Sequence, residues 1–252
     1  MDLKIGTYNI CHCGNFEKRK QSGKDFVVKV DIEKTASAIK GLGLDVIGLN
    51  EVFDDGEKEE YLKQTEKLAR LAGYEYFEFA LGEKFSWTTI GNAVLSHFPI
   101  IGVEKIIVEK PEEKDRNIEG ALWWEDRVLL IVDILVDKKP IRVIESHFGL
   151  NLLEQQNIVK KVCKVIDESK YPVVLMGDFN VLPNDQVLND IYQRLKSVAK
   201  ETGNKEFTFS SYNPEKQIDY IFVSKSVKIK SCTVHDILTS DHRPLTAEIE
   251  MH

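Results

Sequence analysis

Apolar residues recur along the chain with two different spacings, one typical of amphipathic helices and one of buried strands. Spacings of three to four residues predict four helices, with apolar positions in residues 32–42, 62–72, 158–166 and 187–195. Asp31 can cap the first of these helices and Gly73 can end the second. Short continuous apolar runs predict buried strands at 46–49, 93–95, 128–135, 141–144, 173–176, 218–223 and 245–249. Strands interleaved with helices, with a meander-like stretch around residues 90–147, predict stacked sheets covered by helices.

Composition narrows the class of protein without identifying it. The 252 residues are 42% hydrophobic and contain no Pro/Gly/Ser-rich linker, so we expect one globular domain over residues 1–252. The 34 Lys and Arg against 41 Asp and Glu give a net charge of -7, which argues against a nucleic-acid binder held by a broad basic surface but does not exclude a metal-assisted one. The N-terminus lacks a basic segment followed by an apolar one, and no apolar run approaches about 18 residues. We therefore expect a cytoplasmic, monomeric protein.

Four cysteines are too few for a disulfide framework in a chain of this length. Cys11 and Cys13 flank His12, which permits a metal site. However, structural zinc usually takes four ligands, and no second cysteine pair follows.

Polar residues stand where the predicted strands end. These positions are Asn9, Asn50-Glu51, Glu145-Ser146-His147 and Asp178-Phe179-Asn180. Loops at the carboxyl ends of strands leave a crevice over a rigid floor, so ligands bind there. Asp219 and Ser240-Asp241-His242 add two carboxylates and a histidine beside later strands. If the strands are neighbours, these groups converge on one site.

The motifs, taken together, resemble those of the endonuclease/exonuclease/phosphatase superfamily. They occur in its order and approximate spacing from residue 7 to residue 242, as Thr7-Tyr8-Asn9-Ile10, Asp45 to Glu51, Gly91 to Ser96, Ser146-His147-Phe148, Gly177 to Asn180, Ile218 to Ile221 and Ser240-Asp241-His242. The resemblance implies a compact bacterial-type member with a four-layered α/β sandwich, in which two packed mixed sheets are flanked by helices as in DNase I. It also implies hydrolysis of phosphate esters with a divalent metal.

Glu51 is the first candidate for binding that metal. A hard cation such as Mg²⁺ binds through one or two carboxylates and keeps several waters, and Mn²⁺ can replace it. By resemblance, Asn9 and Asp241 complete the metal's contacts with the protein.

The remaining polar residues can supply acid and base chemistry. Asp178, after a tight turn at Gly177, can accept the proton of an attacking water, and Asn180 can donate to the phosphate or the nucleophile. Asp219 can orient His242 and raise its pKa, so that the imidazolium donates to a phosphoryl oxygen. His147 would be either a donor in the transition state or the acid that protonates the leaving group.

The sequence leaves two candidate phosphate-binding residues undecided between two interpretations. Asn92 either binds phosphate or is a turn residue after Gly91, and Arg116 either grips phosphate with its guanidinium or belongs to a solvated turn. Asn50 stands where many members have Gln, so its supporting hydrogen bond should be shorter or absent.

Recognition loops for the substrate are not shared across the superfamily. The basic cluster around Lys18, Arg19 and Lys20 follows Asn9 and favours a polyanion, so nucleic acid is the first expectation. Phe85-Ser86-Trp87 and Trp123-Trp124 could stack bases or touch lipid. A sphingomyelinase-like phospholipid hydrolase or small-phosphoester hydrolase is the alternative enzyme, and a non-catalytic phosphate-binding scaffold is the alternative of another class.

Overall fold

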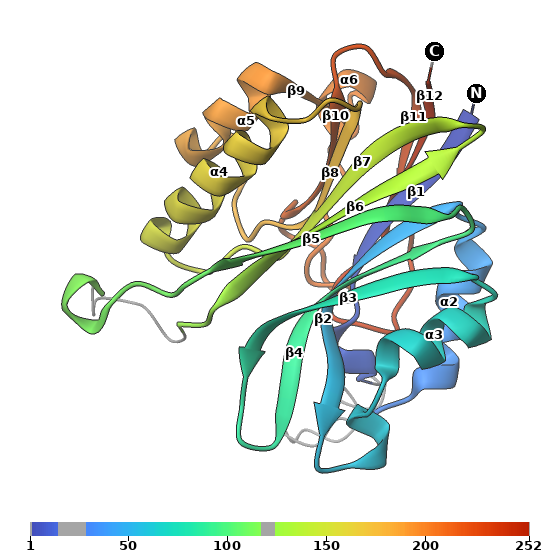
Figure 1. Ribbon diagram of the computed structural model, residues 1–252, viewed down its shortest axis with the longest axis vertical. Coiled ribbons are helices and arrows are strands. Elements are labelled where there is room, and N and C mark those ends of the chain that lie inside the picture. The colour runs from blue at the N-terminus through green and yellow to red at the C-terminus, as the bar shows by residue number, and fades with distance from the viewer. Residues whose placement is uncertain (1, 15–28, 117–123, 252) are drawn as a thin grey trace.

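Two six-stranded β-sheets pack face to face in the computed structural model, which describes residues 2–14, 29–116 and 124–251 (Figure 1). The first sheet has the order β11-β12-β1-β2-β4-β3, with strands Asp2–Asn9 (β1), Val46–Gly56 (β2), Tyr76–Lys84 (β3), Thr88–Ser96 (β4), Lys228–Val234 (β11) and Leu245–Glu250 (β12). The second has the order β5-β6-β7-β8-β10-β9, with strands Ile100–Val108 (β5), Arg127–Val136 (β6), Lys139–Ser146 (β7), Val173–Asp178 (β8), Leu195–Ser197 (β9) and Asp219–Ser224 (β10). Both sheets are mixed, because β1 pairs with β2, and β7 with β8, in parallel.

Helices cover the two outer faces of this sandwich. The helices are Ile32–Leu42 (α2), Gln64–Ala72 (α3), Leu152–Asp167 (α4), Asn189–Arg194 (α5) and Val198–Thr202 (α6). Figure 1 shows α2 and α3 against the first sheet and α4 and α5 against the second, so the expected four-layered α/β sandwich is confirmed. The Asp31 side chain caps α2 by accepting a hydrogen bond from the Lys34 amide, and Gly73 ends α3 with a positive φ, as the sequence predicted.

Three apolar clusters correspond to the three contacts between layers. The cluster between the sheets includes Ile5, Val46, Leu130 and Ile221, and the two outer clusters lie between each sheet and its helices. Sheets buried on both faces explain the continuous apolar runs in the sequence. This packing fixes the positions of the strand ends. The strand ends, in turn, position the polar residues.

The predicted helix over 187–195 is wrong at both ends. Gln186–Leu188 forms a single 3-10 turn, the α-helix covers only Asn189–Arg194, and Leu195 begins β9. Leu195 pairs with Ser224 on β10, so the sheet ladder interrupts the helical spacing. Among the described helices, none is long and apolar enough to cross a membrane.

Candidate active site

Strands from both sheets end at one place, and hydrogen bonds tie them together there. Asn9 ends β1 beside Asn50 of β2, while Asp178 ends β8 directly opposite Asp219, the first residue of β10. The Asp178 amide donates to Asn50 Oδ1 at 2.8 Å, which joins the second sheet to the first. The buried Asn50 replaces the expected Gln and still makes a supporting hydrogen bond, through its own side chain, to the backbone of Asp178.

Glu51 is turned into the site by an irregularity in β2. The pairing of β2 with β4 shifts between Leu49 and Val52, and Glu51 adopts a φ of 56°. Such a left-handed conformation is costly for a residue with a Cβ and persists where the surrounding structure enforces it. The bulge thus re-aims the Glu51 carboxylate from the strand toward the cavity described below.

Asn9 bridges the two carboxylates nearest to it. Its Nδ2 donates to Glu51 Oε1 at 3.0 Å and to Asp178 Oδ2 at 3.1 Å. Its Oδ1, the atom that a cation would need, accepts a hydrogen bond from the Cys11 amide at 3.0 Å. In this arrangement Asn9 orients Glu51 and Asp178, and its Oδ1 keeps a second lone pair.

His242 lies between two buried aspartates. Its Nδ1 is 2.9 Å from Asp219 Oδ2, and its Nε2 is 3.4 Å from Asp178 Oδ2. Burial opposes the charge on the ring, but Asp219 and Asp178 outweigh it and raise the pKa of His242 to about 10. The residue is therefore an imidazolium at neutral pH, and its Nε2 proton faces Asp178.

His147 approaches the same aspartate from the opposite flank in the neutral form. Its Nε2 lies 3.6 Å from Asp178 Oδ2, and Asn180 Nδ2 is 3.2 Å from that nitrogen. Burial, together with the charges of Arg127 and His242, holds the pKa of His147 well below its usual value. The Arg127 guanidinium lies 3.2 Å from Nδ1 and can only donate there, while Nε2 faces both the Asn180 amide nitrogen and the Asp178 carboxylate.

The donor set fits a divalent cation. Burial and then the neighbouring charge of Asp241 raise the pKa of Glu51 to about 7, and burial raises the pKa of Asp178 to about 6. Carboxylates that are desolvated and repel one another are stabilised by a cation with oxygen ligands. Glu51 and Asp241 would hold that cation, with Asn9 supporting the geometry.

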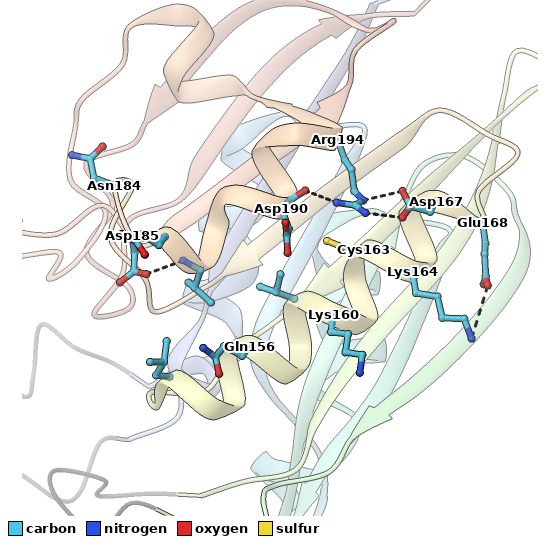
Figure 2. A pocket seen from close by; sticks show the side chains of 14 residues that line it. Gln156, Lys160, Cys163, Lys164, Asp167, Glu168, Asn184, Asp185, Asp190 and Arg194 are labelled. Atoms are coloured by element: carbon cyan, nitrogen blue, oxygen red, sulfur yellow. Dashed lines mark hydrogen bonds and ion pairs between the residues drawn. The ribbon is translucent and has the colours of Figure 1, made fainter.

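These groups open onto a cavity of about 500 Å³. Its wall is mostly aromatic and titratable, formed by His12, Glu51, Phe53, Phe85, Trp87, Ile90, Glu125, Arg127, His147, Leu150, Asp178, Asn180, Phe209, Asp241 and His242. A larger groove between α4 and α5 is lined by charged residues that pair with each other, such as Arg194 with Asp167 and Lys164 with Glu168 (Figure 2). That groove contains none of the residues predicted to be catalytic.

Two predicted phosphate contacts lie away from the cavity wall. Asn92 is buried, accepts from Asn50 and donates to the Val128 carbonyl, so it connects the sheets. Arg116 donates to the Pro111 carbonyl and lies against the Trp124 ring, outside the cavity, because the turn that carries it folds back on itself. The basic cluster Lys18, Arg19 and Lys20 and the residue Trp123 lie outside the described ranges.

Sequence reasoning gave no role to two charged residues of the site. Arg127 begins β6 directly before an apolar run and contacts His147, which gives the cavity an arginine. Glu145 is completely buried between the sheets, where its Oε1 lies 3.5 Å from Thr7 Oγ1. Glu145 was picked out in the sequence by its place at a strand end, as Asp178 was, whereas Arg127 is the first residue of its strand and carried no such signal.

The chain belongs to the Endonuclease/Exonuclease/phosphatase family, whose sequence profile matches residues 6–242. Membership of this family supports a phosphoesterase. Among curated protein sequences, none matches the chain significantly.

Solved structures share the fold at low sequence identity. An endonuclease/exonuclease/phosphatase from Beutenbergia cavernae DSM 12333 has a TM-score of 0.79 and 23% identity, over 99% of this chain and 72% of that one. The mannosyl-6-phosphatase of Bacteroides thetaiotaomicron VPI-5482 has a TM-score of 0.72 and 16% identity, over 99% of this chain and all of that one. ANGEL2, a 2′,3′-cyclic phosphatase, has a TM-score of 0.71 and 18% identity, over 99% and 95%.

Proposed function

We propose that this protein is a divalent-metal-dependent phosphoesterase in which water attacks the phosphorus of a bound ester. The observation that carries the proposal is the position of Asp178. Its carboxylate lies within 3.6 Å of one imidazolium and one neutral imidazole and is fixed by Asn9. A binding scaffold would have no need to assemble two imidazoles around a single buried carboxylate oxygen.

The side chains would divide the chemistry as follows. Asp178 accepts the proton of the attacking water, and the His242 imidazolium, oriented by Asp219, donates to a phosphoryl oxygen as negative charge grows there. His147, which is neutral beside Arg127, would contact the phosphate or the leaving group in the transition state. Mg²⁺ held at Glu51 and Asp241 would neutralise phosphate charge and lower the pKa of the attacking water.

Nucleic acid is the first candidate substrate. Trp87 is 43% exposed on the cavity wall and stacks with Phe85 at a centroid distance of 6.0 Å. Exposed aromatic rings beside a phosphate site bind nucleobases by stacking, without sequence preference. The name of one structural relative, a 2′,3′-cyclic phosphatase, is consistent with chemistry at a nucleotide end.

A small phosphomonoester or lipid headgroup is the second candidate. Among the described residues that line the cavity, Arg127 is the one Lys or Arg, and Glu125 pairs with it at 3.2 Å. Strand-tracking proteins neutralise several phosphates at once, so this wall suits a ligand with a single phosphate. A mannosyl-6-phosphatase among the relatives supports the same choice.

A substrate panel distinguishes the two candidates. Wild-type protein is assayed with Mg²⁺ and Mn²⁺ on single-stranded and duplex oligonucleotides, sphingomyelin, inositol phosphates, a sugar phosphate and a chromogenic phosphodiester. The proposal requires metal-dependent hydrolysis of at least one of these, and the first candidate requires the highest kcat/KM on oligonucleotides. Trp87→Ala should then lower kcat/KM on oligonucleotides by about 5- to 150-fold, corresponding to about 1–3 kcal/mol of stacking, with sugar phosphates unaffected. Hydrolysis of none of these esters would refute the proposal.

A further inference from the structure

A second group of metal-binding side chains lies beside the candidate active site. One donor atom each from Cys11, His12 and Glu51 lies within 4.8 Å of the other two. Cys11 Sγ is 3.9 Å from His12 Nε2, whereas Glu51 Oε2 is 3.8 Å from the other ring nitrogen, Nδ1, so a single ion would use one of these two nitrogens. Donors around a tetrahedral zinc ion lie on the order of 3.5 Å apart, given bond lengths of about 2.0–2.3 Å. Shortening the separations from within 4.8 Å to about 3.5 Å would therefore bring one donor atom of each residue into a single coordination shell.

The turn that carries Cys11 and His12 is held firmly in an unusual conformation. Cys11, His12 and Cys13 all have positive φ values, of 44°, 48° and 62°. The completely buried Gln64 donates from Nε2 to the His12 carbonyl and accepts from the Phe53 amide through Oε1. The imidazole of His12 stacks on Phe53 with centroids 4.5 Å apart and planes 6° apart. Contacts to both backbone and ring thus preorganise the donors.

The chemistry of the donors differs from that of the hard-cation site. Thiolate and imidazole ligands favour Zn²⁺ and similar transition metals, whereas Mg²⁺ prefers oxygen. His12 and Glu51 also line the cavity, which leaves a coordination position open to water.

We propose that Cys11, His12 and Glu51 form a binding site for a thiophilic divalent transition metal, with Zn²⁺ as the type ligand. As the metal–sulfur bond forms, the Cys11 thiol loses its proton to solvent, so binding one ion releases that proton. Glu51 belongs to both donor sets, and the transition metal therefore occupies a position next to the Mg²⁺ expected by the proposed function. The binding itself does not depend on hydrolysis.

Cobalt provides a direct probe, because Co²⁺ bound to thiolate absorbs strongly in the near ultraviolet. Co²⁺ is titrated into the full-length protein without Mg²⁺, and we expect a charge-transfer band that saturates near one equivalent and disappears when Zn²⁺ is added. Cys11→Ser should abolish the band, and His12→Ala should weaken Co²⁺ binding by at least about 10- to 100-fold, the effect of losing even an outer partner of a metal ligand. The matched control, Cys232→Ser on β11, should leave the band unchanged.

Two further measurements distinguish this site from the proposed catalytic metal and identify its sulfur ligand. In Asp241→Asn the band should persist while Mg²⁺-dependent hydrolysis falls, which separates this site from the proposed catalytic metal. X-ray absorption of the zinc-loaded wild type should show one sulfur at about 2.3 Å. The absence of a band in the wild type, a band that survives in Cys11→Ser, or zinc bound without sulfur would overturn the proposal.

Discussion

Nδ1 of His242 lies 2.9 Å from Oδ2 of Asp219, and the two side chains are only 5% and 1% exposed. This pair comes from two different strand ends, the loop before β12 and the first residue of β10. Together with Asp178, the Asp219 carboxylate keeps a buried histidine, which would otherwise be neutral, in its charged form at neutral pH.

Replacement of Asp219 by Asn should lower the pKa of His242 from about 10, because burial then acts without the nearest compensating carboxylate. Histidine NMR titration of the metal-free protein measures the shift. Activity of the variant should fall first at alkaline pH, where the imidazolium is lost. Asp236→Asn, which changes an exposed aspartate paired with Arg243, is the matched control and should leave the pKa unchanged. An identical His242 pKa in the wild type and Asp219→Asn would show that Asp219 does not raise the pKa of His242.

Replacement of Glu51 by Gln should weaken Mg²⁺ and Mn²⁺ binding, because the amide keeps the shape and loses the charge that attracts a hard cation. Calorimetric titration should give a higher Kd, and excess Mg²⁺ should restore part of the activity. Glu57→Gln, on the exposed segment after β2, should titrate like the wild type. If Glu51→Gln bound Mg²⁺ and Mn²⁺ as tightly as the wild type, Glu51 would not be a ligand of the metal.

Much of the fold could be predicted from the sequence, since buried strands and capped helices leave strong local signals. The strands β3, β5 and β11 gave no such signal, because they are edge or outer strands whose exposed positions interrupt the apolar runs. These segments form strands because they pair with neighbouring strands, and their own composition does not predict it. The length of the short helix α5 was overestimated for a related reason. Leu195 pairs with a residue of β10 and therefore belongs to a strand instead of the helix.

The site was less predictable than the fold. Sequence order identified the polar strand ends, and the structure brings Asn9, Glu51, Asp178 and His242 together. The bulge that aims Glu51 and the contact from Arg127 to His147 depend on pairing between distant strands, which no local spacing encodes. Arg116 was chosen for its guanidinium and for its place on a central loop, and its side chain donates to the Pro111 carbonyl instead of lining the cavity.

Glu145 should make the protein less stable as the pH rises. Burial raises the pKa of its carboxyl well above 4.5, so the folded protein retains a proton that the unfolded chain has released. With more protons bound in the folded state, the free energy of unfolding falls as the pH rises above the unfolded value. Glu145→Gln should flatten that decline in urea titrations at pH values above 4.5, because the amide cannot ionise. Glu168→Gln on the surface is the control, and equal slopes in Glu145→Gln and the wild type would contradict the assignment.

The most direct test of the account is the hydrolysis of a chromogenic phosphodiester by the wild type and by Asp178→Asn, each with Mg²⁺ and with chelator. The wild type should require Mg²⁺, and Asp178→Asn should lose about a hundredfold or more in kcat, since general-base catalysis typically contributes at least that much. KM and metal affinity should change little, because the amide keeps the size of the side chain. Asp185→Asn, on the loop after β8, should match the wild type. Activity of Asp178→Asn within about tenfold of the wild type, or hydrolysis unaffected by chelator, would contradict the assignment of a metal-assisted base at Asp178.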